Sequence, residues 1–252
     1  MTPRVTVVGL GPGGADLITP QARAALEAGP VLVRTARHPA VEELRAAGVV
    51  LEPLDAVYEA APDLDAAYAT IVARVVDAAR ASGTAVYAVP GSPGVAERAV
   101  GLLRQRADAG EITVEVVPGL SFADLAWARL GVDPMATGAR VIDGRDLERA
   151  AGLGGALLIA QCDTRLVLSD VKLALLEVTD PATEVVVLQR LGLPDESVAR
   201  VPLVELDRAI EPDHLTSVYV DTGEASIAGE TARLVALAER LRGPGGCPWD
   251  AE

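Results

Sequence analysis

A glycine-rich turn directly after a short apolar run places the strongest constraint on how this chain folds. The run is Val5–Val8, and the turn is Gly9-Leu-Gly11-Pro12-Gly13-Gly14. Glycine has no Cβ and reaches positive φ, whereas proline fixes its own φ and lacks an N–H donor, so the turn has a defined shape. Thr19, followed by a proline, can cap a helix. The stretch therefore predicts a buried strand, an open loop that approaches a ligand, and a helix over residues 21–28.

The same turn also satisfies the G-x-G-x-x-G spelling of a dinucleotide-binding loop. That motif requires a helix that starts within the glycines and an acidic residue about 20 positions later, after the second strand. Here the helix is expected only after Gly14, and the apolar run Val31–Val33 leads into Arg34 instead of an acid. The spacing therefore disfavours a nicotinamide site, which stays as the third functional hypothesis.

The first half of the chain alternates apolar runs with helical patterns. A helix from Leu64 carries its apolar residues at three- and four-residue spacing, which predicts one buried stripe. Further strands are expected at 84–89 and 112–117, with a helix over 95–106 between them. Alternation of this kind is typical of a parallel sheet that is covered on both faces. The stripe residues are Leu64, Tyr68, Ile71, Val72, Val75 and Ala79.

The second half follows a different pattern, so we place a domain boundary after residue 117. Two extended runs, Glu184–Arg190 and Ser197–Val201, are separated by turn residues and predict an antiparallel hairpin. Other strands are expected at 139–142, 156–160 and 216–220, and helices at 163–178 and 230–242. The expected fold is a two-domain α/β protein, with a parallel sheet in residues 1–117 and a mixed sheet in residues 118–242.

Composition excludes several classes of function. A formal net charge of −14 argues against general affinity for nucleic acid or acidic membranes. The two cysteines, Cys162 and Cys247, lack a paired spacing, and with two histidines they predict no metal site. No secretory leader or membrane-spanning apolar run is present, so a cytoplasmic protein with reduced thiols is expected.

Three segments resemble the tetrapyrrole methylase family. The first is the opening loop, whose spelling Gly-x-Gly-Pro-Gly-x-x-x-Leu-Ile-Thr matches that family. The second is Tyr87–Pro93, where the family has a strand and Gly-Asp-Pro, and the third is Val117–Phe122, where it has Pro-Gly-x-Ser-(Ser/Phe). Members bind S-adenosylmethionine in a cleft between two α/β domains. The resemblance covers nearly all of residues 4–242 and implies the same cofactor, and a cleft between the two domains, in this chain.

The resemblance also implies which residues contact the donor, whereas no catalytic residue can be named. All three loops follow strands, at the sheet edge where ligands of open α/β folds bind. Ser92 stands where the family usually has Asp, so the resemblance does not establish that this chain transfers a methyl group. A fourth contact is implied after a second-domain strand, where the family often has a Met-containing turn. The implied donor-binding residues are Gly11, Pro12, Gly13, Pro90, Gly91, Ser92, Pro93, Gly119, Ser121, Phe122, Gln161 and Cys162.

A basic cluster after the second strand is the candidate substrate-binding site. Arg34, Arg37 and His38 are expected at the same sheet edge as the glycine loops. Arginine forks suit carboxylate groups, so the cluster can hold an anionic substrate. Alternatively, it is a solvated loop whose arginines pair with nearby acids. The sequence does not decide between these hypotheses.

The end of the chain resembles a second kind of protein. Residues 241–250, Leu-Arg-Gly-Pro-Gly-Gly-Cys-Pro-Trp-Asp, resemble the opening of a MazG-type nucleoside triphosphate pyrophosphohydrolase domain. Residues 243–252 are therefore expected to be a linker and the start of that segment. The resemblance implies a homodimeric S-adenosylmethionine-dependent methyltransferase, fused to a MazG-type domain and acting on a small molecule. The alternative is a catalytically silent donor-binding or regulatory module of the pyrophosphohydrolase.

Overall fold

The computed structural model describes residues 2–147, 154–223 and 227–242, and its contacts divide the chain into two compact units. The first unit contains residues 1–125 and 192–194, and the second contains 126–191 and 195–252. The boundary expected from the sequence, after residue 117, lies at the end of a strand, whereas the first unit runs into the following helix. Residues 243–252, expected to be a linker, lie outside the described residues.

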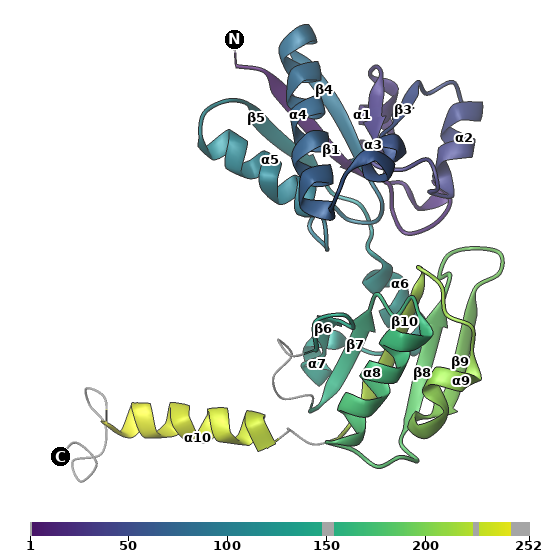
Figure 1. The fold of residues 1–252 in the computed structure, drawn as a ribbon, viewed down its shortest axis with the longest axis vertical. Coiled ribbons are helices and arrows are strands. Elements are labelled where there is room, and N and C mark those ends of the chain that lie inside the picture. The colour runs from purple at the N-terminus through teal and green to yellow at the C-terminus, as the bar shows by residue number, and fades with distance from the viewer. Residues whose placement is uncertain (1, 148–153, 224–226, 243–252) are drawn as a thin grey trace. The chain divides into compact units, whose positions relative to one another are not determined.

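The first unit is built on a parallel five-stranded sheet (Figure 1). Its strand order is β3-β2-β4-β1-β5, and each neighbouring pair is parallel. The strands are β1 (Arg4–Gly9), β2 (Val31–Val33), β3 (Leu51–Pro53), β4 (Thr84–Val89) and β5 (Thr113–Val117). The helices are η1 (Ala15–Leu17), α1 (Pro20–Glu27), α2 (Ala40–Ala46), α3 (Asp55–Ala60), α4 (Leu64–Ser82) and α5 (Arg98–Asp108).

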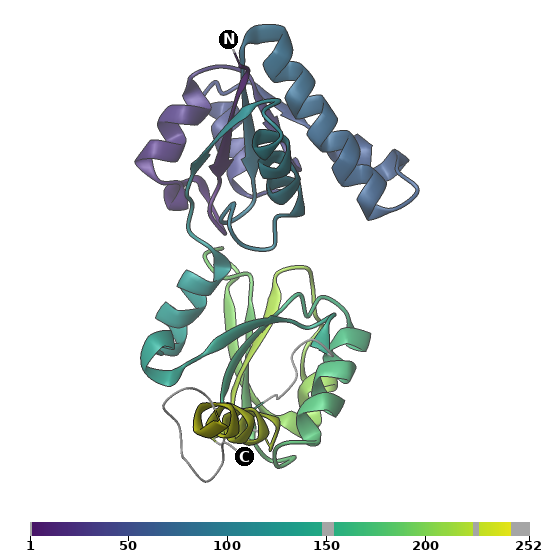
Figure 2. The same cartoon turned by 90° about the vertical axis from the view of Figure 1, so that its left-hand side faces the viewer.

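Helices cover both faces of this sheet, and Figure 2 shows α1 and α4 on opposite sides. One core cluster joins the sheet to α3, α4 and α5, and the other joins it to α1 and α2. Successive residues of one strand face different clusters: Val7 belongs to the first and Val8 to the second. The central strands β1, β2 and β4 are largely buried and mainly apolar, as the sequence predicted for a parallel sheet.

Helix ends in this unit follow from local side chains. Thr19 accepts a hydrogen bond from the Ala22 N–H at 3.2 Å, and Asp63 accepts one from the Ala66 N–H at 2.8 Å. Gly83, at φ +84°, ends α4 in the left-handed region. The predicted buried stripe of α4 is confirmed from Ile71 onward, but Leu64 is wrong: at the first helical residue it is 60% exposed.

The helix expected over 95–106 begins three residues later than predicted, at Arg98. The cause is Ala96, which has φ +54° and therefore cannot belong to a right-handed helix. The short helix α3 was not predicted, because six residues carry too little periodicity to be recognised.

The second unit contains a mixed five-stranded sheet in the order β6-β7-β10-β8-β9. Strands β6 and β7 are parallel, and all other neighbours are antiparallel. The predicted β8–β9 hairpin is confirmed, with Glu184 opposite Pro202. The strands are β6 (Arg140–Asp143), β7 (Ala156–Ala160), β8 (Glu184–Gln189), β9 (Ser197–Pro202) and β10 (Thr216–Asp221).

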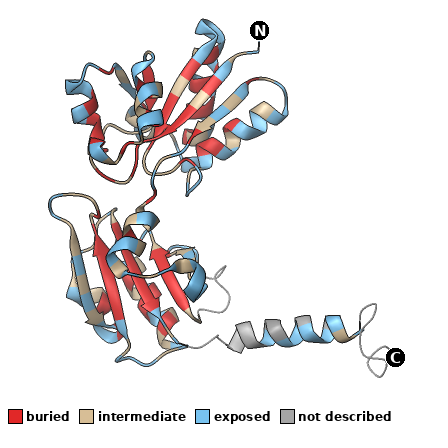
Figure 3. Cartoon of the chain, turned by 180° about the vertical axis from the view of Figure 1, so that it is seen from behind, coloured by how far each residue is buried: buried red, intermediate tan, exposed pale blue. Residues whose placement is uncertain are grey.

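The central strands of the second unit are well buried (Figure 3). On one face, α8 and α9 pack on the sheet through residues such as Leu168 and Leu206. On α6, the Trp127 ring meets Tyr219 of β10 edge to face, with centroids 6.3 Å apart. The helices are α6 (Phe122–Leu130), which begins in the first unit, α7 (Pro134–Thr137), α8 (Arg165–Leu176), η3 (Leu203–Glu205), α9 (Leu206–Ala209) and α10 (Ile227–Arg242). The predicted α/β fold, with one parallel and one mixed sheet, is confirmed.

Candidate functional site

Three glycine loops meet at the carboxyl ends of the adjacent strands β4, β1 and β5. The β1 strand continues into its loop with Leu10, whose N–H donates to Val89 O at 2.9 Å. Beyond it, Gly11 and Gly91 exchange two hydrogen bonds, 2.8 Å from Gly91 N to Gly11 O and 3.1 Å from Gly11 N to Gly91 O. The β1 and β4 loops are therefore joined backbone to backbone, past the point where the strands themselves end.

Gly9 explains why this junction is built from glycine. A Cβ at Gly9 would lie 2.7 Å from Gly119 N, from Gly91 O and from Pro93 Cδ. A Cβ at Gly119 would lie 2.7 Å from Gly91 O and 2.9 Å from Gly9 Cα. No side chain fits at either position, because backbone from all three loops occupies the space. Gly9 belongs to this junction, although it was not among the residues that the sequence implied for the donor site. Its position directly after the apolar run Val5–Val8 is the sequence signal that could have identified it.

Gly91 differs from these two positions because the space beside it is open. Its φ is +61°, which favours glycine, but a Cβ there would meet only Leu120 O, at 3.9 Å. The next residue, Ser92, accepts a hydrogen bond from the Gly94 N–H at 3.4 Å and is partly exposed. The segment after β4 therefore turns sharply and leaves room at its backbone, as a loop that receives a ligand must.

The β5 loop is fixed by hydrogen bonds at both of its ends. The Thr19 hydroxyl donates to Pro118 O at 3.4 Å. On the other side, the Asp124 carboxylate accepts the Ser121 N–H at 2.6 Å, which is one half of a capping box at the start of α6. Ser121 is 7% exposed, and Phe122 is the first residue of α6. The hydrogen bond that fixes this end of the loop is therefore the one that Asp124 accepts.

The structure brings ten of the predicted donor-binding residues to this one sheet edge, all within the first unit. They lie on the three segments that follow β1, β4 and β5 along the chain. These residues are Gly11, Pro12, Gly13, Pro90, Gly91, Ser92, Pro93, Gly119, Ser121 and Phe122.

The predicted substrate-binding residues lie on the segment after β2, and two of them already have partners. Arg34 forms an ion pair with Glu97, and its Nε donates to the Tyr58 hydroxyl at 3.0 Å. His38 is 7% exposed, and its Nε2 lies 2.9 Å from Gly11 O. Arg37 is exposed. That the three residues bind an anionic substrate stays a prediction, and Arg37 is the member whose side chain is most accessible.

The electrostatics of this cluster follow from burial. Burial raises the pKa of Glu97, although the charge of Arg34 and its hydrogen bond oppose the rise. For Arg34, burial alone would lower the pKa, but the Glu97 carboxylate together with Tyr58 and Tyr68 raises it by more, so the guanidinium stays charged. Burial also lowers the pKa of His38, against the hydrogen bond to Gly11. The imidazole is therefore neutral, and the arginine and glutamate are a compensated pair.

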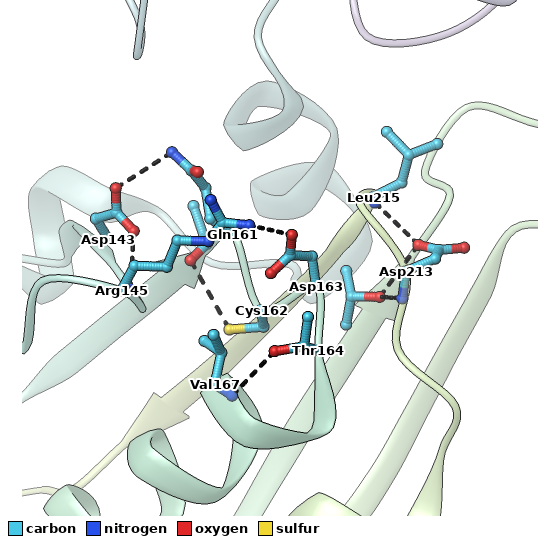
Figure 4. A network of polar contacts seen from close by, with 11 residues as sticks. Asp143, Arg145, Gln161, Cys162, Asp163, Thr164, Val167, Asp213 and Leu215 are labelled. Carbon is cyan, nitrogen blue, oxygen red and sulfur yellow. Dashed lines mark hydrogen bonds and ion pairs between the residues drawn. The ribbon is translucent and has the colours of Figure 1, made fainter. Parts of the chain in front are cut away.

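The remaining two predicted residues, Gln161 and Cys162, follow β7 in the second unit, where they belong to a polar network (Figure 4). Gln161 has φ +58°, is exposed, and its Nε2 donates to Asp143 Oδ2 at 3.2 Å. Arg145, which follows β6, pairs with Asp163, which follows Cys162 in the turn after β7. The turn is therefore held by side chains from the ends of the parallel strands β6 and β7.

Cys162 lies in the core, with 0% of its surface exposed. Its sulfur is within 3.5 Å of Ile159 O, and its N–H donates to Thr216 O at 3.1 Å. Burial, with the charges of Asp143 and Asp163, raises the pKa of the thiol to about 12. Cys162 is therefore not a nucleophile, and its contact with a donor, which stays a prediction, would not involve an exposed thiol.

Two further structural features concern possible metal ligands and long apolar helices in the described part of the chain. Among the residues described there, no group of three or more His, Cys, Asp or Glu side chains could hold a metal ion. None of the described helices combines the length and apolarity that crossing a bilayer requires.

The chain resembles solved methyltransferase structures. It is 28% identical to uroporphyrin-III-C-methyltransferase from Thermus thermophilus, with a TM-score of 0.67, over 88% of this chain and 93% of that one. A second structure of that enzyme, complexed with S-adenosyl homocysteine, has a TM-score of 0.65 and 21% identity over 86% and 97% of the two chains. Diphthine synthase, 14% identical with a TM-score of 0.67 over 90% and 93%, shares the fold.

A curated relative extends beyond this sequence. Uncharacterized protein YabN from Bacillus subtilis (strain 168) is 37% identical over 254 residues, which span 99% of this chain and 52% of that protein. The chain therefore spans about half the length of this relative. The model of the family described as Tetrapyrrole (Corrin/Porphyrin) Methylases matches residues 4–207, which include all three glycine loops. The chain belongs to the tetrapyrrole methylase family.

Proposed function

We propose that the chain binds S-adenosylmethionine at the three glycine loops and transfers its methyl group to a small-molecule acceptor. The observation that carries the proposal is the junction of Gly9, Gly91 and Gly119. At two of these positions a Cβ would strike backbone, whereas at Gly91 the space is open. Tightly packed backbone at Gly9 and Gly119, with free space beside Gly91, suits a ligand that is held by backbone groups. The family, and a solved neighbour that is complexed with S-adenosyl homocysteine, support the same assignment.

The chemistry places modest demands on the protein. The donor supplies an activated methyl group on a sulfonium, so transfer depends on alignment more than on acid, base or metal. The three loops hold the donor by backbone and shape, which agrees with their low charge. From the second unit we include Gln161, which is exposed, and Cys162 through its backbone alone. We propose the exposed Arg37 as a contact to the acceptor.

A second candidate function is a donor-binding module without turnover. Ser92, in place of the family's usual Asp, favours it, because one carboxylate is missing beside the loop that carries Gly91. Such a module would regulate the remainder of a longer protein. The resemblance of residues 241–250 to a MazG-type opening makes a nucleoside triphosphate pyrophosphohydrolase the proposed remainder. We also propose a homodimer, which light scattering would test.

Calorimetric titration with S-adenosylhomocysteine tests donor binding. We expect a dissociation constant in the micromolar range, which corresponds to about −8 kcal/mol. Gly91→Val should abolish binding, because its side chain would fill the open space and strain a residue at φ +61°. Gly29→Ala is the matched control, since a Cβ there meets nothing within 4 Å.

Two outcomes separate the candidates. If millimolar S-adenosylhomocysteine produces no heat of binding and no thermal shift, both functions are contradicted. A parallel titration with NADH tests the nicotinamide hypothesis. If the donor binds, incubation of labelled S-adenosylmethionine with a small-molecule cell extract distinguishes transfer from a silent module. Label incorporated by the wild type, but not by Gly91→Val, supports methyl transfer.

A further inference from the structure

The segment Arg34–His38 contacts two of the three glycine loops. On the β4 side, Arg34 pairs through NH1 with Glu97 Oε1. Glu97 ends the loop that begins at Pro90, because α5 starts at the next residue. The same guanidinium donates from Nε to Tyr58 and lies 5.9 Å from the centroid of that ring. The far end of the β4 loop is therefore tied to the segment after β2.

Glu97 occupies its position at an energetic cost. Its side chain is 3% exposed, and the residue before it, Ala96, has φ +54°, an unfavourable conformation for a residue with a Cβ. One of its oxygens, Oε2, is buried with no hydrogen-bond partner among the described residues. The helix dipole does not require this burial, because an acid at a helix start interacts favourably with the dipole even when its side chain is exposed to water. The pair with Arg34 is what requires Glu97 to point inward.

On the β1 side, His38 plays the corresponding part. Its Nδ1 accepts the Ala40 N–H at 3.2 Å, so the proton of the neutral ring is on Nε2. That Nε2–H then donates to Gly11 O at 2.9 Å. Gly11 is the residue that exchanges two hydrogen bonds with Gly91, so a side chain after β2 fixes the centre of the loop junction.

The middle of the segment is fixed as well. Asp55 accepts the Thr35 hydroxyl at 2.6 Å and the Ala36 N–H at 2.7 Å. Asp55 is the first residue of α3, so the segment is attached to a helix that packs in the core. Both ends of the segment therefore contact a donor loop, while its middle is anchored to the rest of the unit.

We infer that Arg34–His38 is a clamp that presets the donor loops, with Arg34, Glu97 and His38 as positioning residues. The inference rests on the proposed function, since the loops are there assigned to the donor. It gives Arg34 and His38 a role different from substrate binding, while Arg37 stays available to the acceptor. The clamp predicts local effects: loss of Glu97 loosens the β4 loop, and loss of His38 loosens the β1 loop.

The test combines amide hydrogen exchange of the ligand-free full chain with calorimetry. In Glu97→Ala, exchange in residues 91–97 should accelerate at least tenfold, and in His38→Ala the same should occur in residues 10–15. Each variant should bind S-adenosylhomocysteine at least tenfold more weakly. His38→Gln should restore much of the affinity, because a Gln amide can donate to Gly11 O. Glu97→Gln, which keeps the size of the side chain, serves if Glu97→Ala does not fold.

The matched control is Asp207→Ala in the second unit. It breaks a comparably enclosed pair, Lys172 Nζ to Asp207 Oδ2 at 2.6 Å, with side chains 11% and 17% exposed. It should lower the melting temperature and leave both loop exchange and affinity unchanged. If the clamp variants behave like this control, their role is structural only and the inference is overturned. If the wild type fails to bind S-adenosylhomocysteine, the proposed function fails, but exchange in the free chain still tests the clamp.

Discussion

His38 is a neutral, buried histidine whose two ring nitrogens are both used by the backbone. Burial lowers its pKa below the ordinary value of 6.5, so the unfolded chain takes up a proton at a higher pH than the folded chain does. The stabilising contribution of the neutral ring is therefore complete above pH 6.5. It is lost progressively as the pH falls from there through the folded-state pKa.

We therefore expect the first unit to lose stability between pH 7.5 and pH 5.5, and His38→Gln to lose less. Glutamine does not titrate, so the difference between the two proteins isolates the histidine from the carboxylates of the chain. The measurement is the slow amide exchange of β1 and β4, which reports unfolding of the sheet. Identical pH dependence in both proteins would contradict the assignment of a lowered pKa to His38.

The sequence could predict where Arg34 and His38 lie, but not what they contact. Their position after β2 placed them at the correct sheet edge, because strand ends follow from the alternation of elements. Glu97 was missed, since an acid near an expected helix start usually faces water. The left-handed Ala96, which directs Glu97 inward, has no signature in sequence. A pair that joins residue 34 to residue 97 depends on tertiary packing alone.

At the scale of single elements, the turn after β1 is specified by backbone contacts as much as by its own residues. Its spelling was sufficient to predict a loop, and Thr19 was sufficient to predict the helix start. The contact of Gly9 with the other two loops could not be predicted, because it requires the register of three strands. That register pairs Val8 with Ala88 and with Val117.

Two glycines of this loop should respond differently to alanine. Gly9→Ala places a Cβ 2.7 Å from three atoms of the neighbouring loops, so we expect a loss of about 1–3 kcal/mol, as for an overpacked core. Gly14→Ala meets the ends of two carboxylate side chains, of which Asp16 is nearest at 2.8 Å, and its φ of −67° suits any residue. We expect a change within about 0.5 kcal/mol. Amide exchange of β1 and β5 measures both, and equal losses would argue against a closed junction at Gly9.

For the whole molecule, the parallel and mixed sheets could be predicted because each has its own sequence pattern. Near-continuous apolar strands separated by helices indicated the first sheet, and the close pair β8 and β9 indicated the second. Short helices such as α7 and α9 were not predicted. Each has four residues, so their positions depend on the turns and caps around them, as with the Asp133 cap of α7.

Charge gives a prediction for the molecule as a whole. With a net charge of −14, the folded chain repels itself and other polyanions. We expect it to pass through a heparin column at 50 mM salt and to gain a few degrees in melting temperature between 50 and 500 mM sodium chloride, since salt screens repulsion. Retention on heparin would reveal a basic surface that the residue count does not indicate. A melting temperature that falls with salt would mean that attractive ion pairs dominate.

The central position of β1 has a consequence for how the chain folds. The first strand of the sequence lies between β4 and β5, so Arg4 pairs with Thr84 and with Thr113. These partners are 80 and 109 residues away along the chain, and such distant parallel pairings form slowly. During synthesis β1 stays without neighbours until most of the first unit has left the ribosome, and the glycine junction cannot form before β5 has joined. The loops that we assign to the donor are therefore complete only once the first unit has its native topology, so ligand binding requires this unit to be folded.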